Sequence, residues 1–477
     1  MPTPIEIPIV LQTPFDRLRH AFAEHGGLTY GERSRYLSAL QDAIRDRQDD
    51  IVAAIDADFG CRSKYETLLG ELMLVVNSIK TTRKRMKGWM KPRRRHISWL
   101  FMPAHNRVHY QPLGVVGIIA PWNYPFLLAV EPLVGAISAG NRVLIKPSEF
   151  TPKTSEVLVD LLGAVFPADV VAVVTGDAAI GAAFSSLPFD HLLFTGSTQV
   201  GRRVMRAAAE NLTPVTLELG GKSPTLFHDS YPIEKGCEAF LGGKLFNSGQ
   251  TCIAPDYLLV PKGKERAYAD AITAVASKRY PRILDNPDYT SIVNERHRRR
   301  LQGYLKEAKE LGATAMVINP ANETFDDDSI KMPLTLLLDV TDEMTVMQDE
   351  IFGPILPIVG YETLEAALQF INDRPRPLAL YYFDNDSSRV RRVLERTVSG
   401  GVCINSTIMH VAQDDLPFGG VGASGLGAYH GREGFETFSH AKGVFFQSRL
   451  NASALLNPPY TSSLDTILNV TIGKLKK

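Results

Sequence analysis

The stretch RVLIKPSEFTPKTSEVLVDLLGAVFPADVVAVVTG, residues 142–176, decides the fold class of this chain. Its apolar strand pattern RVLI is followed by the amphipathic helix pattern PKTSEVLVDLLGAVF and by a second strand pattern, VVAVV. The same alternation continues through HLLFTG, TQVGRRVMRAAAENL and PVTLELGG. Strands joined by helices at this interval form right-handed crossovers, so the sequence predicts a parallel, doubly wound sheet covered on both faces.

A second alternating set of patterns follows Cys252. Its strand candidates are DYLLVPK, ATAMVIN, ILPIVGY, LALYYF and GGVCIN, separated by helical patterns such as RLQGYLKEAKEL. We therefore expect two α/β domains with a ligand cleft between them, because open α/β sheets bind ligands beyond the carboxyl ends of their strands. Ahead of both sets, residues 35–59 and 66–86 predict two long amphipathic helices.

Length, charge and cysteine content narrow the class of protein. The chain has 477 residues, which is too long for one ordinary core, and its 52 basic and 52 acidic residues balance. That balance removes any overall argument for nucleic acid or an anionic membrane as a partner. Four cysteines without a C-x-x-C pair suggest neither a disulfide framework nor a zinc site, so we expect no metal.

The N-terminus lacks a charged leader followed by a long apolar region, and no run of about 18 apolar residues appears later. We therefore expect a soluble cytoplasmic protein. One segment, RKRMKGWMKPRRRH from Arg83 to His96, departs from this balance because it is rich in lysine and arginine. It also contains Trp89. It is either a solvated helix end and loop or a contact for a membrane surface or polyanion.

Cys252 lies in NSGQTCIAPDYLLV, residues 247–260, where a polar turn containing Gly249 joins a helical pattern to a strand pattern. Such a thiol is either a small buried hydrophobe or a nucleophile. Glu218 follows the strand PVTL in apolar surroundings that raise a carboxyl pKa, and it is either a general base or the partner of Lys222. Asn123 either caps a helix or donates to an oxyanion.

Several polar residues stand where the predicted strands end. Lys146 and Glu149 follow RVLI, and GSTQVG, residues 196–201, follows HLLFT. The G-x-G-x-x-G fingerprint is missing, so this signal is weak and turn chemistry also explains it. Nevertheless, glycine and serine at the start of a helix leave backbone donors for a phosphate, and Lys146 and Glu149 could hold ribose hydroxyls.

Seven motifs carry a family resemblance. PWNYP, KPSE, FTGS, LELGGK, GQTC, EIFGP and LPFGGVGASGLG, spread in this order over nearly the whole chain, resemble those of the NAD(P)-dependent aldehyde dehydrogenase superfamily. The short N-terminus and NYPF resemble its dimeric class-three branch. Within that branch, PFDHLLFTG, LDNPDYTSI, DDLPFGGVG and GAYHGREGFETFSHAK are similar to the group of bacterial coniferyl aldehyde dehydrogenases.

The resemblance implies an aldehyde dehydrogenase-like α/β fold of two doubly wound domains and a small β oligomerisation element. The cofactor-binding domain would comprise residues 1–97 and 112–222, and the catalytic domain residues 223–425. Residues 98–111 and 426–477 would form the oligomerisation element and the C-terminal tail. The strand patterns GVFFQSRL and NRVHYQP resemble those that join two subunits of class-three enzymes, which implies a homodimer.

The resemblance also assigns chemical roles. Cys252 would attack the aldehyde to form a thiohemiacetal, and Asn123 with the Cys252 backbone N–H would stabilise the oxyanion. Glu218 would activate water to release the acid from the thioester, which disfavours transfer to coenzyme A. NAD is expected over NADP because Glu149 repels a 2'-phosphate. The expected cofactor contacts are Trp122, Lys146, Ser148, Glu149, Gly176, Gly196, Ser197, Gly201, Leu219, Glu350 and Phe352.

An aromatic, coniferaldehyde-like substrate is the preferred prediction, and a fatty or other apolar aldehyde is the alternative. A cysteine hydrolase using His191 or His410, or a catalytically silent relative, represents a different class. Glu131 is either paired out of reach of the substrate or accepts a hydrogen bond from a phenolic hydroxyl. The expected substrate pocket consists of Tyr124, Leu127, Leu128, Glu131, Phe246, Ile253, Ile408, Met409 and His410.

Overall fold

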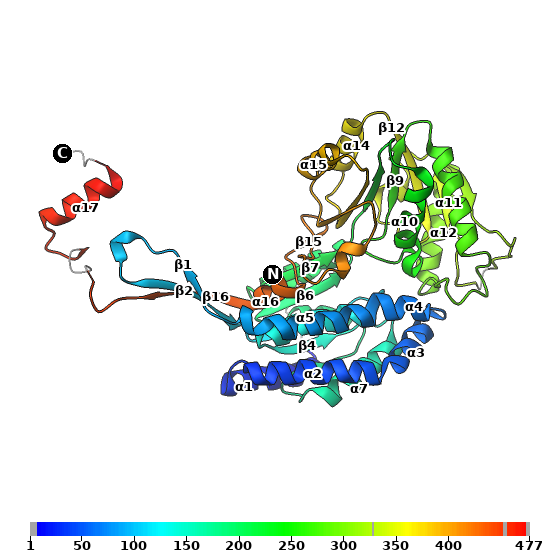
Figure 1. Ribbon diagram of the computed structural model, residues 1–477. Coiled ribbons are helices and arrows are strands. Elements are labelled where there is room, and N and C mark those ends of the chain that lie inside the picture. Colours follow the sequence, from blue (N-terminus) through cyan, green and yellow to red (C-terminus); the bar gives the residue numbers. More distant parts are fainter. Residues whose placement is uncertain (1–6, 327–328, 452–455, 474–477) are drawn as a thin grey trace.

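Three β-sheets organise the chain in this computed structural model, which describes residues 7–326, 329–451 and 456–473. Figure 1 shows two α/β bodies one above the other, with a three-stranded arm that extends to one side. The two alternating sets of the sequence thus form two separate sheets, as predicted.

The first sheet has six strands in the order β15-β7-β6-β3-β4-β5. All neighbours are parallel except β15, which runs antiparallel to β7. Strand order reverses between β3 and β6, so their carboxyl ends border the crevice in which such sheets bind ligands. The strands are β3 (Val115–Ile119), β4 (Arg142–Lys146), β5 (Val171–Val173), β6 (His191–Gly196), β7 (Val215–Leu219) and β15 (Gly425–Leu426).

Helices cover both faces of this sheet. Every residue of α6 is buried, which agrees with its almost wholly apolar sequence. The N-terminal helix α1, which contains Pro14, was not predicted. The helices are α1 (Ile9–His25), α2 (Tyr30–Asp46), α3 (Gln48–Phe59), α4 (Lys64–Thr67), α5 (Met73–Trp89), α6 (Leu127–Ala139), α7 (Pro152–Val165), α8 (Ala178–Ser185), α9 (Thr198–Ala209) and α16 (Gly431–Thr437).

Of the two long helices predicted from the N-terminal region, the first is interrupted and the second is continuous but irregular. The first is broken at Arg47 (φ −110°, ψ 20°), which ends α2 and begins α3. The second contains a π-helical turn, η1 (Leu68–Leu72), between α4 and α5. Apolar periodicity continues across each irregularity because both flanking helices pack on the same core, so the pattern conceals the break.

The second sheet has seven strands in the order β10-β11-β12-β9-β8-β13-β14, with only β10 antiparallel to its neighbour. The four-residue strands β8 and β11 were not predicted. The strands are β8 (Pro224–Phe227), β9 (Tyr257–Pro261), β10 (Thr314–Val317), β11 (Thr335–Leu338), β12 (Ile355–Tyr361), β13 (Ala379–Phe383) and β14 (Gly401–Ile404). The helices are α10 (Ile233–Leu245), η3 (Phe246–Gly249), α11 (Glu265–Arg279), α12 (Glu295–Glu310), α13 (Thr345–Gln348), α14 (Leu364–Asn372), α15 (Ser387–Arg396) and η4 (Met409–Ala412).

The third sheet forms the arm from β1 (Arg93–Arg95), β2 (His105–Pro112) and β16 (Ser439–Phe446), with a 3-10 turn, η2 (Trp99–Phe101), at its tip. Figure 1 shows α17 (Ser462–Ile472) beyond the arm, away from both bodies. The basic segment supplies the end of α5 and the strand β1. Its Trp89 is buried against Phe435 and is therefore not placed to contact a membrane surface.

The sheets suggest how the chain divides into domains. β1 pairs with the arm and β15 with the first sheet, so each falls outside the range expected for it from sequence. We propose the same three-part division, with the arm beginning at β1 and the cofactor-binding domain including β15. No helix within the described residues combines the length and apolar character that crossing a bilayer requires.

Candidate active site

The turn that presents Cys252 has a strained backbone. Asn247, Ser248 and Gly249 have φ values of 55°, 52° and 75°, in the left-handed region. At Gly249 a Cβ atom would lie 2.6 Å from the Gly353 carbonyl oxygen, so glycine is required there. Strain of this kind persists only where surrounding contacts determine it, and it is common at functional sites.

The Cys252 thiol is held neutral in the free protein. Burial, followed by the charges of Glu350 and Glu218, raises its pKa to about 12. The two carboxyl groups therefore lie close enough to act on the sulfur. A thiolate is the reactive form, so reaction at neutral pH requires a base or a bound cation nearby.

Glu218 lies in β7 near its carboxyl end and is only 3% exposed. Neither carboxylate oxygen has a hydrogen-bond partner, and burial raises its pKa well above the usual value. The alternative of a pair with Lys222 was wrong, because the Lys222 Nζ binds Asp256 Oδ1 at 3.1 Å instead. A buried carboxyl without a partner is suited to exchange a proton with a reacting group.

Asn123 follows β3 at the point where strand order reverses. Its Nδ2 donates to the Gln250 carbonyl at 3.1 Å, which aims the amide at the turn before Cys252 and leaves one N–H for a ligand. The helix-capping alternative was wrong. The first amides of α6, those of Phe126 and Leu127, donate to Glu71 at 2.9 and 3.0 Å.

Glu350 and Phe352, which precede β12 of the second body, lie where that body meets Trp122 of the first. Glu350 Oε1 is buried without a partner, and burial raises the pKa of Glu350 to about 8. Phe352 has a φ of 52° and packs edge-on against Trp122 at 5.4 Å. His297 and Arg300 on α12 also belong here, since His297 packs on Trp122 at 4.8 Å and Arg300 lies 3.5 Å from the Phe352 carbonyl. We did not predict these two residues, whose only signal is their i, i+3 spacing in a basic helix.

The other predicted cofactor residues lie at the strand ends of the first sheet. Lys146 and Glu149 pair at 2.9 Å at the end of β4. Ser197 caps α9 by accepting from the Val200 N–H, which leaves the other first-turn amides available to an anion. Leu219 packs against Gly201, where a Cβ would lie 2.6 Å from its Cδ2.

Three further predicted cofactor residues lie nearby on the chain. Ser148 accepts from the Phe150 N–H at 3.2 Å, so its hydroxyl serves a turn. Gly176 precedes α8 and Gly196 ends β6. Together with the Glu350 oxygen that has no partner among the described residues and the free α9 amides, these groups have the chemistry to hold a dinucleotide. Within the described residues, no group of three or more histidine, cysteine or acidic side chains could hold a metal ion.

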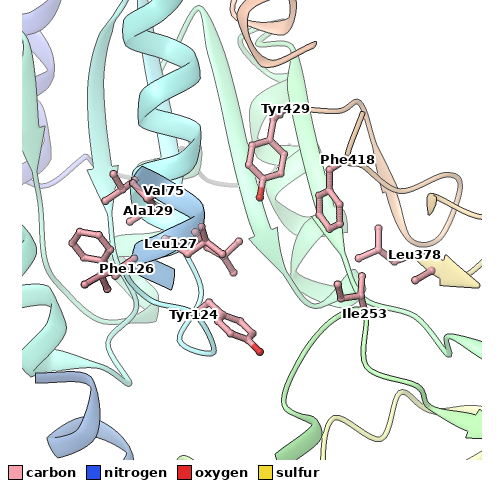
Figure 2. Packing of buried hydrophobic residues seen from close by; sticks show 14 of the residues in the cluster. Val75, Tyr124, Phe126, Leu127, Ala129, Ile253, Leu378, Phe418 and Tyr429 are labelled. Carbon is pink, nitrogen blue, oxygen red and sulfur yellow. The ribbon is translucent and has the colours of Figure 1, made fainter. Parts of the chain in front are cut away.

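Aromatic and aliphatic side chains surround the approach to Cys252. Figure 2 shows Tyr124 and Leu127 facing Ile253, Phe418 and Tyr429 from the other side of the same buried cluster. Phe418 and Tyr429 were not on our predicted list. Tyr429 is only 2% exposed, yet its hydroxyl has no hydrogen-bond partner among the described residues, so it is available to a ligand.

Most other predicted pocket residues gather around this cluster. Tyr124 stacks on Phe246 at 6.4 Å, and its hydroxyl bonds Thr251 Oγ1 at 2.7 Å. Leu128 is buried and Ile408 is half-buried with a φ of 53°. Met409 is 56% exposed, so it lies at the surface.

Neither candidate histidine supports the cysteine hydrolase alternative. His410 Nδ1 lies 3.1 Å from the sulfur of Cys403, not Cys252. His191 Nε2 lies 2.9 Å from Thr216 Oγ1. Burial lowers the pKa of each imidazole to about 4. Both imidazole rings therefore contact residues other than Cys252.

Glu131 lies one turn after Leu127 on α6 and is buried. Ser78 donates to its Oε1 at 2.6 Å, whereas Oε2 has no partner. Burial raises the Glu131 pKa to about 8, so the group is mostly a neutral acid at pH 7. Burial, followed by the charges of Glu218, Glu131 and Cys252, raises the pKa of the nearby Tyr429 hydroxyl well above its usual value.

Comparison with known proteins agrees with this geometry. Residues 14–444 match the model of the aldehyde dehydrogenase family. The chain is 53% identical to a probable coniferyl aldehyde dehydrogenase of Pseudomonas aeruginosa, covering 96% of this chain and 95% of the relative. It is 45% identical to the coniferyl aldehyde dehydrogenase of Pseudomonas sp. strain HR199, covering 97% and 96%.

A solved structure, the substrate-bound state of Staphylococcus aureus AldH, superposes with a TM-score of 0.90 at 39% identity. It covers 96% of this chain and 99% of that chain. The expected family and fold are thus confirmed.

The thiol environment predicts a pH dependence. In the free protein, alkylation of Cys252 by iodoacetamide should rise about tenfold per pH unit from pH 7 to 10, because only the thiolate reacts and its pKa of about 12 lies above that range. Glu350→Gln should speed alkylation at pH 9, where the wild-type carboxylate is charged. Glu149→Gln is the matched control, and peptide mass spectrometry separates the four thiols. A rate that levels off below pH 9 would contradict this assignment.

Proposed function

Because the chain belongs to the aldehyde dehydrogenase family, we propose that it oxidises an aromatic aldehyde of the coniferyl type to the carboxylic acid, with Cys252 as nucleophile. The observation that carries this proposal is the meeting of Cys252, Glu218 and Asn123 where the two α/β bodies join. A thiol, a partnerless buried carboxyl and an amide with a free N–H are the groups that acyl chemistry on sulfur needs.

The first step is attack of the Cys252 sulfur on the aldehyde carbon, which places negative charge on the former carbonyl oxygen. The free N–H of Asn123 and the backbone N–H of Cys252 stabilise that charge. Loss of one such donor costs about 3 to 4 kcal/mol in other enzymes. The C–H bond of that carbon then breaks, its hydride leaving for the acceptor that a bound NAD(P) would supply, and the C=O bond re-forms to leave a thioester on Cys252.

Glu218 completes the turnover. Its carboxylate takes a proton from water, the resulting hydroxide attacks the thioester carbonyl, and the acid leaves as the Cys252 sulfur departs. Because burial raises the Glu218 pKa, the basic form becomes more abundant as pH rises. The steady-state rate should therefore increase with pH over the range in which this carboxyl ionises.

The cofactor residues predicted from sequence form part of this proposal. Glu350 and Phe352 would contact the nicotinamide riboside, Lys146 and Glu149 the adenosine ribose, and the α9 amides the pyrophosphate. NAD is preferred over NADP because the Glu149 carboxylate repels a 2'-phosphate. We also infer a cytoplasmic location, where a thiol such as Cys252 stays reduced.

The substrate assignment rests on the relatives and on the pocket. Both relatives above are named for coniferyl aldehyde. The aromatic rings of Tyr124, Phe246, Phe418 and Tyr429 suit a flat conjugated substrate. At the polar end, Glu131 Oε2 would share a hydrogen bond with the phenolic hydroxyl.

The arm would join two copies of the chain into a homodimer. β16 pairs with β2 along one edge, and nothing within the described residues pairs with its other edge. Phe445 on this strand is 49% exposed, and Leu450 just after it is 80% exposed. An open strand edge flanked by apolar side chains favours pairing with a second chain.

A burst experiment tests the two chemical roles. Cys252→Ala should abolish cofactor reduction, whereas Glu218→Gln should release about one equivalent of reduced cofactor and then stall, because only thioester hydrolysis needs the base. Mass spectrometry should find the acyl group on Cys252. Glu156→Gln, an exposed carboxylate on α7, is the control. Absence of the burst in Glu218→Gln would instead make Glu218 the base that activates the thiol.

A substrate panel tests the specificity. Coniferaldehyde should have a higher kcat/KM than cinnamaldehyde, benzaldehyde, hexanal and succinic semialdehyde. Glu131→Leu should reduce the coniferaldehyde to cinnamaldehyde ratio about fivefold to tenfold, the value of one buried hydrogen bond. Glu131→Gln should keep more of that ratio, because an amide retains a donor beside the Ser78 bond. Preference for hexanal would indicate a fatty aldehyde enzyme, and an unchanged ratio in Glu131→Leu would exclude Glu131.

Light scattering at micromolar concentration tests assembly. The wild type should have twice the chain mass of 52.6 kDa. Phe445→Glu should shift it toward monomer, because a charge at the open edge opposes strand pairing. Val159→Glu on α7, at a similarly exposed apolar position, is the control. A wild-type monomer, or a dimer insensitive to Phe445→Glu, would refute this arrangement.

A further inference from the structure

A buried polar cluster lies directly behind the oxyanion site and consists of Arg62, Glu66 and Glu71. The three residues belong to the segment from the end of α3 through η1, and their exposed fractions are 2%, 8% and 0%. Burying three ionisable side chains together costs several kcal/mol per ion unless their partners compensate. The sequence patterns gave no hint of them.

Arg62 contacts the backbone that supplies the oxyanion amide. Its Nη1 donates to the Asn123 carbonyl oxygen at 2.9 Å. The guanidinium also packs against the rings of Phe59 and Tyr124, each with its centroid 4.9 Å away. The contacts with Asn123 and Tyr124 hold the β3–α6 connection, and the contact with Phe59 ties it to the end of α3.

The two carboxylates reach the neighbouring chain segments. Glu66 Oε2 accepts from the Asn247 N–H at 3.0 Å, in the strained turn before Cys252. Glu71 Oε2 accepts from the first amides of α6. Arg62 lies between them, with its Nε 4.0 Å from Glu66 and its Nη2 3.7 Å from Glu71. One cluster therefore touches both segments that supply oxyanion donors.

The Arg62 ion pairs are not arranged for greatest stability. Its Nε and Nη2 have no hydrogen-bond partner, and neither does Glu71 Oε1. A buried ion pair of this kind often adds little to the stability of the fold. Apolar side chains of similar volume often stabilise the fold equally well. A planar guanidinium does, however, fix the position of the carbonyl it binds better than a flexible ammonium does.

We propose that Arg62 is a positioning residue for the oxyanion site, acting through the Asn123 carbonyl to hold the Asn123 amide in its catalytic orientation. The proposal rests on the proposed role of Asn123. Arg62 itself does not touch the substrate. Its effect on rate should therefore require the Asn123 side chain, and this dependence separates positioning from general stabilisation.

A double-mutant cycle measures that dependence. Asn123→Ala should lower kcat about 100-fold to 1,000-fold. Arg62→Lys should lower kcat about tenfold, because a small displacement of a catalytic group has effects of that size, while the KM for NAD stays unchanged. In the Asn123→Ala background, Arg62→Lys should change kcat by less than about twofold.

Each outcome has a distinct meaning. A tenfold effect of Arg62→Lys that persists without the Asn123 side chain would overturn the positioning role, and so would no effect in the wild type. A wild-type kcat in Asn123→Ala would instead overturn the proposed function of Asn123. Should Arg62→Lys fail to fold, Arg62→Met with Glu71→Gln removes the cation and one carboxylate together and allows the same cycle.

A matched control comes from elsewhere in the same domain. Arg33 is 6% exposed and also donates to backbone carbonyls, those of Leu28 and of Ser138 at the C-terminal end of α6, the end away from Asn123. Arg33→Lys should lower the melting temperature without reducing kcat in either background. If it reproduces the kcat loss of Arg62→Lys, the effect is general loss of packing and the proposal fails.

Discussion

The hydrogen bond from the Asn123 side chain to the Gln250 carbonyl joins the two α/β bodies where the chemistry takes place. Asn123 lies in the loop that follows β3 of the first sheet, and Gln250 belongs to the turn that leads into the second. The two bodies must therefore keep one relative position for the thiol and the amide to face the same point. The buried cluster of Figure 2 maintains that position, because Leu127 packs from one body while Ile253 and Phe418 pack from the other.

Burial shifts the pKa values of the groups at this site and makes their charged forms energetically costly. Cys252, Glu218 and Glu350 have raised pKa values because apolar surroundings disfavour their charged forms. In the free protein the site is thus close to neutral. A cationic ring bound between these groups would favour their anionic forms, which links activation of the thiol to cofactor binding.

Four of the eight non-glycine residues with positive φ in the described part of the chain belong to segments around the candidate site. Asn247, Ser248, Phe352 and Ile408 all have positive φ values without being glycine, and the β-branched Ile408 tolerates this conformation poorly. Each costs about 1 to 3 kcal/mol, which the packing and the buried hydrogen bonds must offset. Rigid packing on both sheets allows these short segments to hold side chains in orientations that local preferences disfavour.

Particular elements show where sequence reasoning succeeded. The alternation from β4 to β5 revealed the parallel sheet because buried strands and amphipathic helices have different apolar periods. The same periodicity could not reveal the break at Arg47, since both helices face one core. The four-residue strands β8 and β11 were missed, although β10 and β14, which are equally short, were predicted.

The sequence by itself determined the family, the fold class and the residue types that the chemistry requires, because ordered motifs and apolar periods are local properties. Only the tertiary structure decided which alternatives hold. Lys222 binds Asp256 and not Glu218, Glu71 and not Asn123 caps α6, and His410 faces Cys403. Glu71 lies 55 residues before the first amide that it caps, and Lys222 lies 34 residues before Asp256. Such partners are set by how distant segments pack, which no single segment encodes.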